Sequence, residues 1–150
     1  MPYLAARVPP GWEVTHVDEE AEEIDWNVAA DLVGITFHTP SAVHAYQIAA
    51  RFRSRGICVV LGGPHVTLVP EEARQHADTI FIGEAEGLWE QFLNSFETRS
   101  YAPVYRQTSA PVSRGFPMPV RTCFTGKTTR VAFCLRRADA RTNMTSAPWP

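Results

Sequence analysis

Short apolar segments alternate with amphipathic segments over the first two thirds of the chain. Residues 12–17 alternate between apolar and polar side chains, which predicts a β-strand with one face toward a core. Three later segments are apolar on both faces, as expected of strands in the middle of a parallel sheet. These segments are residues 31–37, 57–61 and 79–82.

A helical pattern follows each of the three apolar segments. In residues 41–55, Ser41 is placed to cap the helix, and apolar side chains recur at helical spacing. The face expected to be buried consists of Val43, Tyr46, Ala49 or Ala50, and Phe52. Further helices are predicted for residues 70–76 and for about residues 87–97. The order strand–helix–strand–helix–strand–helix is typical of right-handed βαβ units, so an α/β fold with a parallel sheet and helices on both faces is expected.

The composition adds few constraints on function. With 150 residues, of which 45% are hydrophobic, the chain is expected to form one domain of ordinary size and a tail. No run of about 18 apolar residues occurs, which argues against a transmembrane helix, and the first residues lack the pattern of a signal peptide. The cysteines Cys58, Cys123 and Cys134 match neither a disulfide framework nor a zinc site. A reduced, cytoplasmic protein is therefore expected.

The charge is distributed unevenly along the chain. Residues 1–106 contain 15 acidic and 7 basic residues, whereas residues 107–150 contain one acidic and 7 basic residues. A basic arm can bind nucleic acid or a membrane. Here the basic residues lie in a Ser-, Thr- and Pro-rich segment that is expected to be a disordered C-terminal tail, so neither partner is predicted.

Three loops are expected at the carboxyl edge of the sheet, where open α/β sheets bind their ligands. They are residues 37–41, 62–65 and 83–87. The pair Gly62 and Gly63 lets the backbone approach a ligand closely, because neither residue has a Cβ. The chain contains neither a G-x-G-x-x-G motif nor a P-loop. From the residues alone, the prediction is a domain that binds a ligand of unknown kind.

Each of these features also has a simpler structural interpretation. Gly62 and Gly63 are typical of a tight turn, and Glu84 and Glu86 are typical charges at a helix N-terminus. The histidines are too scattered in sequence for their spacing alone to imply a metal site. They include His38, His44, His65 and His76.

Two long runs resemble the cobalamin-binding N-terminal domain of cobalamin-dependent radical S-adenosylmethionine (radical SAM) proteins. They are DLVGITFHTPSAVHAYQIAARFRSRG, residues 31–56, and VVLGGPHVTLVPEEARQHADTIFIGEAEGLWEQFL, residues 59–93. The motifs LGGPH and IGEAEG are specific in combination, and the similarity covers roughly residues 2–106. This resemblance implies a flavodoxin-like or Rossmann-like domain that binds cobalamin. It also implies a radical SAM barrel as partner, often that of a methyltransferase and normally in the same chain.

The resemblance also implies where the cofactor lies. The nucleotide tail of the corrinoid is expected near Thr36 and Gly62-Gly63, and the corrin face near residues 37–41, His65 and residues 83–86. The implied cofactor-binding residues are Thr36, Phe37, His38, Thr39, Ser41, Gly62, Gly63, Pro64, His65, Gly83, Glu84, Ala85 and Glu86.

The chain departs from the family pattern at its beginning, and it also lacks a known motif for a metal ligand. The family opens with a strand before its first helix, and Met1 stands where that helix begins, so a central strand is expected to be missing. Such a loss would make folding marginal, because one large buried apolar side chain contributes about 1.5–3 kcal/mol. The D-x-H-x-x-G loop that supplies an axial histidine in the methionine-synthase type of domain is absent. No metal ligand is therefore assigned, and cobalt ligation by His38 or His65 stays open.

The similarity ends in the C-terminal third of the chain. Residues 116–119 match the family's linker, but the C-x-x-x-C-x-x-C motif of the barrel does not follow, and no iron–sulfur cluster is expected in this chain. Degenerate codons for residues 121–130 allow a family-like linker in a shifted reading frame. We therefore predict a cobalamin-binding domain over residues 1–106 and a linker with an unstructured basic tail over residues 107–150, with a frameshift as a hypothesis for its origin. The alternative functions are a truncated, inactive gene product and a flavodoxin-like domain that binds a nucleotide or another small ligand.

Overall fold

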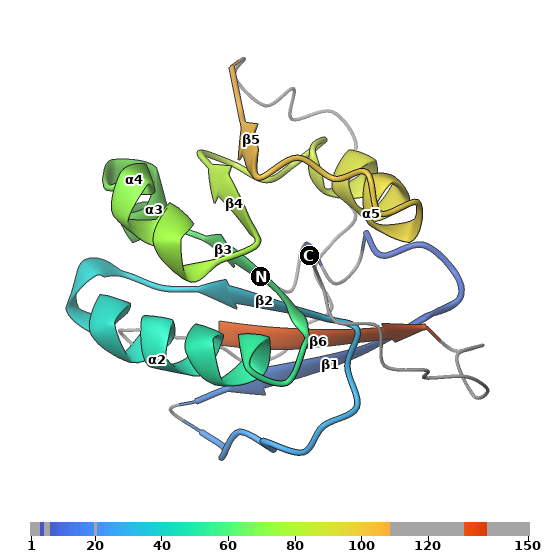
Figure 1. Ribbon diagram of the computed structural model, residues 1–150, viewed down its shortest axis with the longest axis horizontal. Helices are drawn as coiled ribbons and strands as arrows, with labels where there is room; N and C mark the ends of the chain where they lie inside the picture. Colours follow the sequence, from blue (N-terminus) through green and yellow to red (C-terminus); the bar gives the residue numbers. More distant parts are fainter. Residues whose placement is uncertain (1–3, 5–6, 20, 109–130, 138–150) are drawn as a thin grey trace.

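The computed structural model describes residues 4, 7–19, 21–108 and 131–137, which form a sheet with helices on both sides (Figure 1). The sheet has six strands in the order β1-β6-β2-β3-β4-β5. The strands are β1 Trp12–Asp18, β2 Leu32–Thr36, β3 Cys58–Gly62, β4 Thr79–Ile82, β5 Val104–Arg106 and β6 Val131–Arg137. The helices are η1 Thr39–Ser41, α2 Ala42–Arg53, α3 Pro64–Leu68, α4 Pro70–Ala73, η2 Arg74–His76 and α5 Trp89–Glu97.

Strands β2 to β5 form the parallel part of the sheet, as the sequence predicts. Leu32 pairs with Cys58 at the start of β2 and β3, and Thr36 pairs with Gly62 at their ends. All four residues of β4 are buried, which fits a strand covered on both faces. The short strand β5 was not predicted. Its parallel pairing with β4 extends the sheet by one strand.

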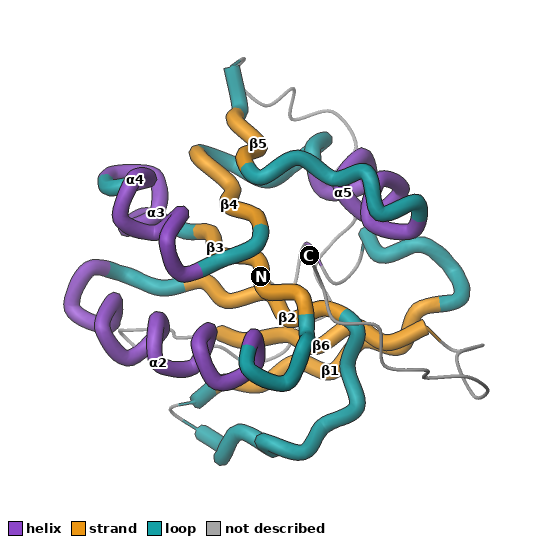
Figure 2. Tube along the Cα trace, viewed as in Figure 1, coloured by secondary structure: helices purple, strands orange, loops and turns teal. Residues whose placement is uncertain are grey.

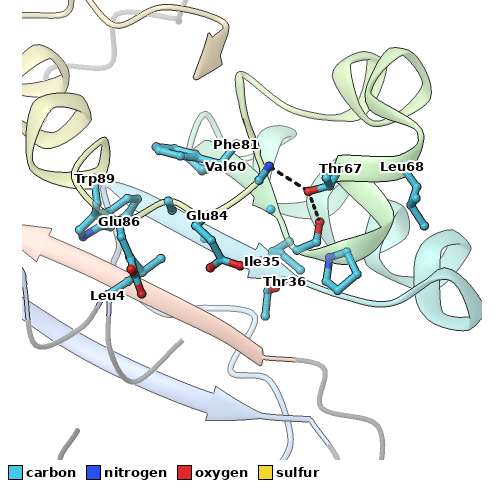
Figure 3. A pocket seen from close by; sticks show the side chains of 16 residues that line it. Leu4, Ile35, Thr36, Val60, Thr67, Leu68, Phe81, Glu84, Glu86 and Trp89 are labelled. Carbon is cyan, nitrogen blue, oxygen red and sulfur yellow. Dashed lines mark hydrogen bonds between the residues drawn. The ribbon is translucent and has the colours of Figure 1, made fainter. Parts of the chain in front are cut away.

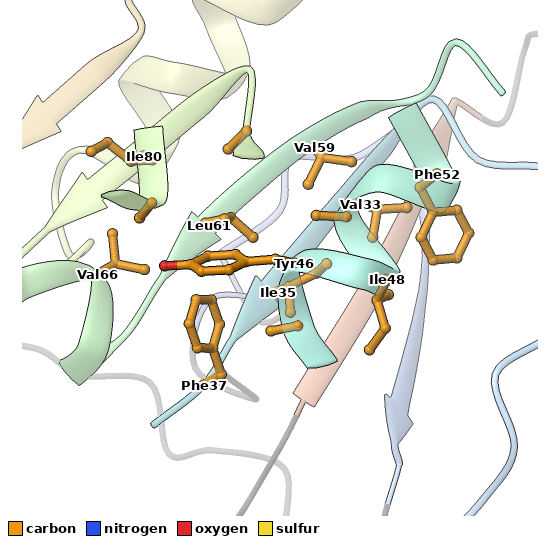
Figure 4. Close-up of a cluster of buried hydrophobic side chains, with 14 of the residues drawn as sticks. Val33, Ile35, Phe37, Tyr46, Ile48, Phe52, Val59, Leu61, Val66 and Ile80 are labelled. Carbon is orange, nitrogen blue, oxygen red and sulfur yellow. The ribbon is translucent and has the colours of Figure 1, made fainter. Parts of the chain in front are cut away.

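The helices cover the two faces of the sheet separately (Figure 2). Side chains alternate along a strand, so Val33 and Ile35 of β2 join one buried cluster, whereas Leu32 joins another. The first cluster includes the inner side of α2 and Val66 of α3 (Figure 4). The second includes the inner side of α5, with Trp89, Phe92, Leu93 and Phe96. The predicted α/β architecture is thereby confirmed.

The buried face of α2 differs from the predicted one. Val43 is 73% exposed, so its assignment to the buried face is wrong. The inner side consists of Ala42, Ala45, Tyr46, Ile48, Ala49 and Phe52. Val43 is one residue, or about 100° of helix rotation, away from Ala42 and therefore faces outward. Ser41 occupies the N-cap position, but its side chain makes no capping hydrogen bond, because the 3₁₀ turn η1 leads directly into the helix.

For residues 131–137, strand β6 corrects the prediction of a disordered C-terminal tail. Residues 131–137 lie between β1 and β2 and pair antiparallel with both (Figure 1). Cys134 is buried in the α2-side cluster, and Leu135 is buried in the α5-side cluster. The strand thus fills the sheet at the position where a central strand was expected to be missing. The basic, Ser- and Thr-rich composition of the whole tail concealed this short apolar run.

Several predictions concern segments that lie outside the described residues. They include most of residues 1–6, where the family's first helix would begin, the linker match at residues 116–119, Cys123 and the segment 121–130 of the frameshift hypothesis. In the described part of the chain, no helix is long and apolar enough to cross a membrane.

Candidate functional site

A pocket of about 620 Å³ opens at the carboxyl ends of the parallel strands, on the face covered by α5 (Figure 3). The ends of β2 and β3 form its floor, and the loop that follows β4 and the start of α5 form one wall. Helix α3 forms another wall. The lining residues are Leu4, Gly34, Ile35, Thr36, Val60, Gly62, Gly63, Pro64, Thr67, Leu68, Phe81, Gly83, Glu84, Ala85, Glu86 and Trp89.

Glycines in neighbouring strands keep the floor of the pocket open. Gly34 in β2 and Gly62 in β3 alternate with Thr36 and Val60 on this face of the sheet. Neither glycine projects a side chain, so the space above them is free for another molecule. A glycine inside a strand commonly marks such a close approach.

Gly62 and Gly63 are adjacent but have different structural roles. Gly63 has a φ of +102°, and a Cβ at this position would lie 2.5 Å from Oγ1 of Thr36 and 3.0 Å from the carbonyl oxygen of Phe37. Only glycine fits there without displacement of the end of β2. A Cβ on Gly62 would meet Phe81 Cβ at 3.8 Å, which is ordinary van der Waals contact. Gly62 is therefore the position at which a larger side chain can enter the pocket.

Thr67 of α3 ties together two loops that border the pocket. Its Oγ1 donates a hydrogen bond to the carbonyl oxygen of Gly63 at 3.1 Å and accepts one from the backbone N–H of Gly83 at 3.0 Å. These bonds hold the loop after β3 against the loop after β4. Thr67 was not among the predicted site residues.

The described lining is largely apolar and carries two acidic side chains. Ile35, Val60 and Phe81 line it from the sheet, while Glu84 and Glu86 come from the loop after β4. When ionised, both carboxylates can accept hydrogen bonds but cannot donate them. The pocket therefore suits a flat apolar group inside it and polar N–H donors near the glutamates.

The predicted site residues fall into two groups on opposite sides of the sheet edge. The pocket is lined by Thr36, Gly62, Gly63, Pro64, Gly83, Glu84, Ala85 and Glu86. The others, which do not line it, are Phe37, His38, Thr39, Ser41 and His65. Phe37 is buried in the α2-side cluster, and His38 and Thr39 are exposed at the sheet edge.

His65 is directed away from the pocket. Its side chain is buried, with 5% of the residue exposed, and its ring lies against those of Phe37 and Tyr46. Nδ1 of His65 lies 3.1 Å from Oγ1 of Thr39. This geometry makes the imidazole part of the α2-side packing.

The family is decided by a comparison with known protein families. The model of the B12 binding domain matches residues 2–93, more than half of the chain. This chain belongs to the B12-binding domain family. The match confirms the resemblance on which the cobalamin prediction rests.

This B12-binding domain is similar to three curated proteins. It is 38% identical over 121 residues to bacteriochlorophyllide d C-8(2)-methyltransferase of Chlorobaculum tepidum, covering 74% of this chain and 27% of that protein. It is 31% identical over 100 residues to bacteriochlorophyllide d C-12(1)-methyltransferase of the same organism, covering 65% of this chain and 22% of that protein. It is also 31% identical over 106 residues to an uncharacterized methyltransferase of Pyrococcus horikoshii, PH0819, covering 62% of this chain and 23% of that protein. The chain therefore spans about a quarter of the length of these relatives.

The pocket of this B12-binding domain includes residues that sequence reasoning missed. Gly34 carried a usable signal, because it interrupts an otherwise apolar strand. The remaining missed residues are Leu4, Ile35, Val60, Thr67, Leu68, Phe81 and Trp89. Their side chains are common in any core or helix, so only the three-dimensional arrangement identifies them. The open floor over Gly34 and Gly62 fits a bulky planar ligand. Among the described residues, no three His, Cys, Asp or Glu side chains gather in a way that could hold a metal ion.

Proposed function

We propose that this B12-binding domain holds cobalamin at the carboxyl edge of its sheet, with the nucleotide tail in the pocket beneath α5. The observation that carries the proposal is the opening over Gly34 and Gly62, where each of two adjacent strands has a glycine on the pocket face. Of the implied cofactor-binding residues that line this pocket, Thr36, Gly62 and Gly63 would contact the tail. The family membership supports the identity of the ligand.

The character of the pocket suits the tail of cobalamin. The base of the nucleotide is a flat apolar bicycle, and Val60, Phe81 and Trp89 offer it apolar surface. Each Å² of apolar surface that leaves water contributes about 25 cal/mol. The hydroxyl of Thr36, at the end of β2, would serve the sugar or phosphate part of the tail as a hydrogen-bond partner.

The rim of the pocket suits the corrin ring. Leu68 lines the pocket and is 74% exposed, an unusual state for a large apolar side chain beside a cavity. A ring lying over the sheet edge would cover it. Glu84 and Glu86 would accept hydrogen bonds from the carboxamide arms of the ring.

The role of this chain in chemistry would be to bind and orient the cofactor. When bound, the corrinoid supplies a cobalt centre that can carry an alkyl group in methyl transfer. Two of the similar proteins are named as bacteriochlorophyllide methyltransferases. We therefore propose that the chain works with a catalytic radical SAM barrel of a methyltransferase, which would provide the substrate site.

The proposal is tested by titrating the purified chain with hydroxocobalamin and following the corrinoid absorption spectrum. Saturable binding and co-migration of corrinoid with folded protein on gel filtration are expected. The second ligand is cobinamide, which has the ring but lacks the nucleotide tail. Cobalamin should bind more tightly than cobinamide, because only cobalamin fills the pocket.

Two variants separate the tail from the ring. Gly62→Leu places a large side chain in the pocket and should weaken cobalamin binding while leaving cobinamide binding nearly unchanged. Val43→Ser alters an exposed residue of α2 outside the pocket lining and serves as the matched control. A folded chain that binds neither corrinoid would refute the proposed function. Equal loss of both ligands in Gly62→Leu would refute the placement of the tail.

A further inference from the structure

A second group of polar side chains lies on the α2 side of the same sheet edge. It consists of Thr39 at the start of η1, His65 in α3 and Glu72 in α4. The imidazole of His65 is buried, and its Nδ1 lies 3.1 Å from Oγ1 of Thr39. Thr39 is exposed. The buried ring thus contacts a hydroxyl that reaches the surface where the corrin ring is proposed to lie.

The other side of the His65 ring lacks a hydrogen-bond partner in the described structure. Its Nε2 is buried, and the nearest carboxylate oxygen is Oε1 of Glu72, at 3.7 Å. The hydroxyl of Tyr46, also buried, makes no hydrogen bond of ordinary geometry, and its neighbouring acceptor is again Glu72. Buried polar atoms are rarely left without partners, since desolvation then goes uncompensated. Glu72 is half-exposed, so its side chain has room to close the remaining gap.

Glu72 also influences Tyr46. Burial, and after it the neighbouring Glu72 carboxylate, raise the pKa of the Tyr46 hydroxyl to about 12. The hydroxyl therefore stays protonated at neutral pH and can donate its proton to an acceptor such as Glu72. Phe37 and His76 complete the surroundings of Tyr46, with the His76 ring stacked on it at 4.0 Å between centroids.

The chemistry of Glu72 determines which nitrogen of His65 should carry the proton. An ionised carboxylate only accepts hydrogen bonds, so it favours a proton on Nε2 and disfavours a lone pair there. With the proton on Nε2, Nδ1 becomes an acceptor, and Thr39 must donate its hydroxyl proton to it. The lone pairs of the Thr39 oxygen then remain available on the exposed side.

We propose that Glu72 and His65 fix the Thr39 hydroxyl as a hydrogen-bond acceptor for a carboxamide N–H of the corrin ring. His65 is then a positioning residue that acts through Thr39 and not a ligand of cobalt. This inference rests on the proposed function, because it assigns a recognition role to Thr39 and His65, two predicted site residues that do not line the pocket.

The tautomer can be measured without any corrinoid. In the ¹⁵N-labelled chain at neutral pH, long-range ¹⁵N–¹H spectra distinguish the two neutral forms of each imidazole. The His65 signals are identified by their absence from the His65→Asn variant. The neutral form with the proton on Nε2 is expected. A proton on Nδ1, or on both nitrogens, would overturn the inference whether or not cobalamin binds.

The recognition role is tested by binding of hydroxocobalamin to variants. Thr39→Val removes the hydroxyl with little change in shape, and Glu72→Ala removes the carboxylate. Both substitutions should weaken the binding of hydroxocobalamin about 2- to 10-fold, which corresponds to the loss of one hydrogen bond. Thr39→Ser keeps the hydroxyl and should bind like the unmodified chain. Glu71→Ala, which removes the same charge from the adjacent residue of α4, is the matched control and should also leave binding unchanged.

Cobalt ligation makes a different prediction. In a chain labelled with ¹⁵N-histidine, the electron paramagnetic resonance spectrum of bound Co(II) cobalamin should show no splitting from His65. A label-dependent splitting that disappears in His65→Asn would overturn the positioning role. Unchanged affinity in Thr39→Val would overturn the acceptor role. Failure of the unmodified chain to bind hydroxocobalamin would instead refute the proposed function, while the tautomer measurement would still decide the state of His65.

Discussion

Alanine at Gly62 and alanine at Gly63 are expected to affect stability very differently, although the two residues are adjacent. At Gly63, the φ of +102° is a conformation that costs residues with a Cβ about 1–3 kcal/mol. The Cβ would also lie 2.5 Å from Oγ1 of Thr36, and overpacking of this kind costs typically about 1–3 kcal/mol. Gly63→Ala should therefore lower the free energy of unfolding by about 2–6 kcal/mol.

At Gly62, the corresponding Cβ meets Phe81 at an ordinary distance of 3.8 Å. Replacing glycine by alanine inside a strand commonly stabilises it by roughly 0.5–1 kcal/mol. Gly62→Ala should consequently change the free energy of unfolding by less than about 1 kcal/mol. The comparison holds the chemical change constant and varies only the backbone conformation and the neighbours of the new methyl group.

Urea denaturation followed by circular dichroism measures both variants. The midpoint should fall for Gly63→Ala with an unchanged m-value, since the compactness of the folded state is not expected to change. Thr36→Ala removes the oxygen that the new Cβ would meet, so in that background the cost of Gly63→Ala should decrease. The cost of the positive φ should remain. Equal midpoints for Gly62→Ala and Gly63→Ala would refute the reasoning.

Three further predictions concern the packing of the sheet and its loops. Leu135→Ala should lower the free energy of unfolding by about 2–5 kcal/mol, because Leu135 is fully buried; an unchanged urea midpoint would mean that β6 is not in the sheet. Thr67→Val removes the hydrogen bonds that Thr67 makes with Gly63 and Gly83. It should lower the free energy of unfolding by about 1–3 kcal/mol in the same assay, whereas Thr67→Ser should lower it much less. Burial, and after it Asp78, raise the pKa of the Cys58 thiol from 9.0 to about 12. The unfolded thiol ionises first, so stability should fall as pH rises from 9 toward 12; a Cys58→Ala variant with the same pH slope would contradict this.

The parallel core of the fold could be predicted from the sequence because its signals are local. Residues 31–37 and 79–82 are apolar on both faces, and β2 and β4 lie within them. The ends of the elements and the buried faces of the helices were predicted less accurately. Val43 was assigned to the wrong side of α2, since a shift of one residue in the helical pattern moves a side chain by about 100°.

The candidate site was predicted in part for a similar reason. Gly62 ends β3, Gly63 follows it and Glu84 comes two residues after β4, so their place at the carboxyl edge was predictable. What could not be predicted is which side of that edge each residue faces. His65 follows Gly63 by two residues yet turns toward Tyr46, because α3 begins at Pro64 and rotates successive side chains to different sides.

The position of β6 has a consequence for the order in which the chain can fold. In the described structure, β1 joins the sheet only through β6, and the paired residues run from Asp18 with Val131 to Trp12 with Arg137. Such contacts connect segments more than a hundred residues apart, which slows folding because a large loop must close first. During synthesis, β1 leaves the ribosome well before β6 and must wait until residues 131–137 have been made. Until then, β1 and the facing side of β2 expose unpaired backbone groups, a state that favours association with other chains and with chaperones.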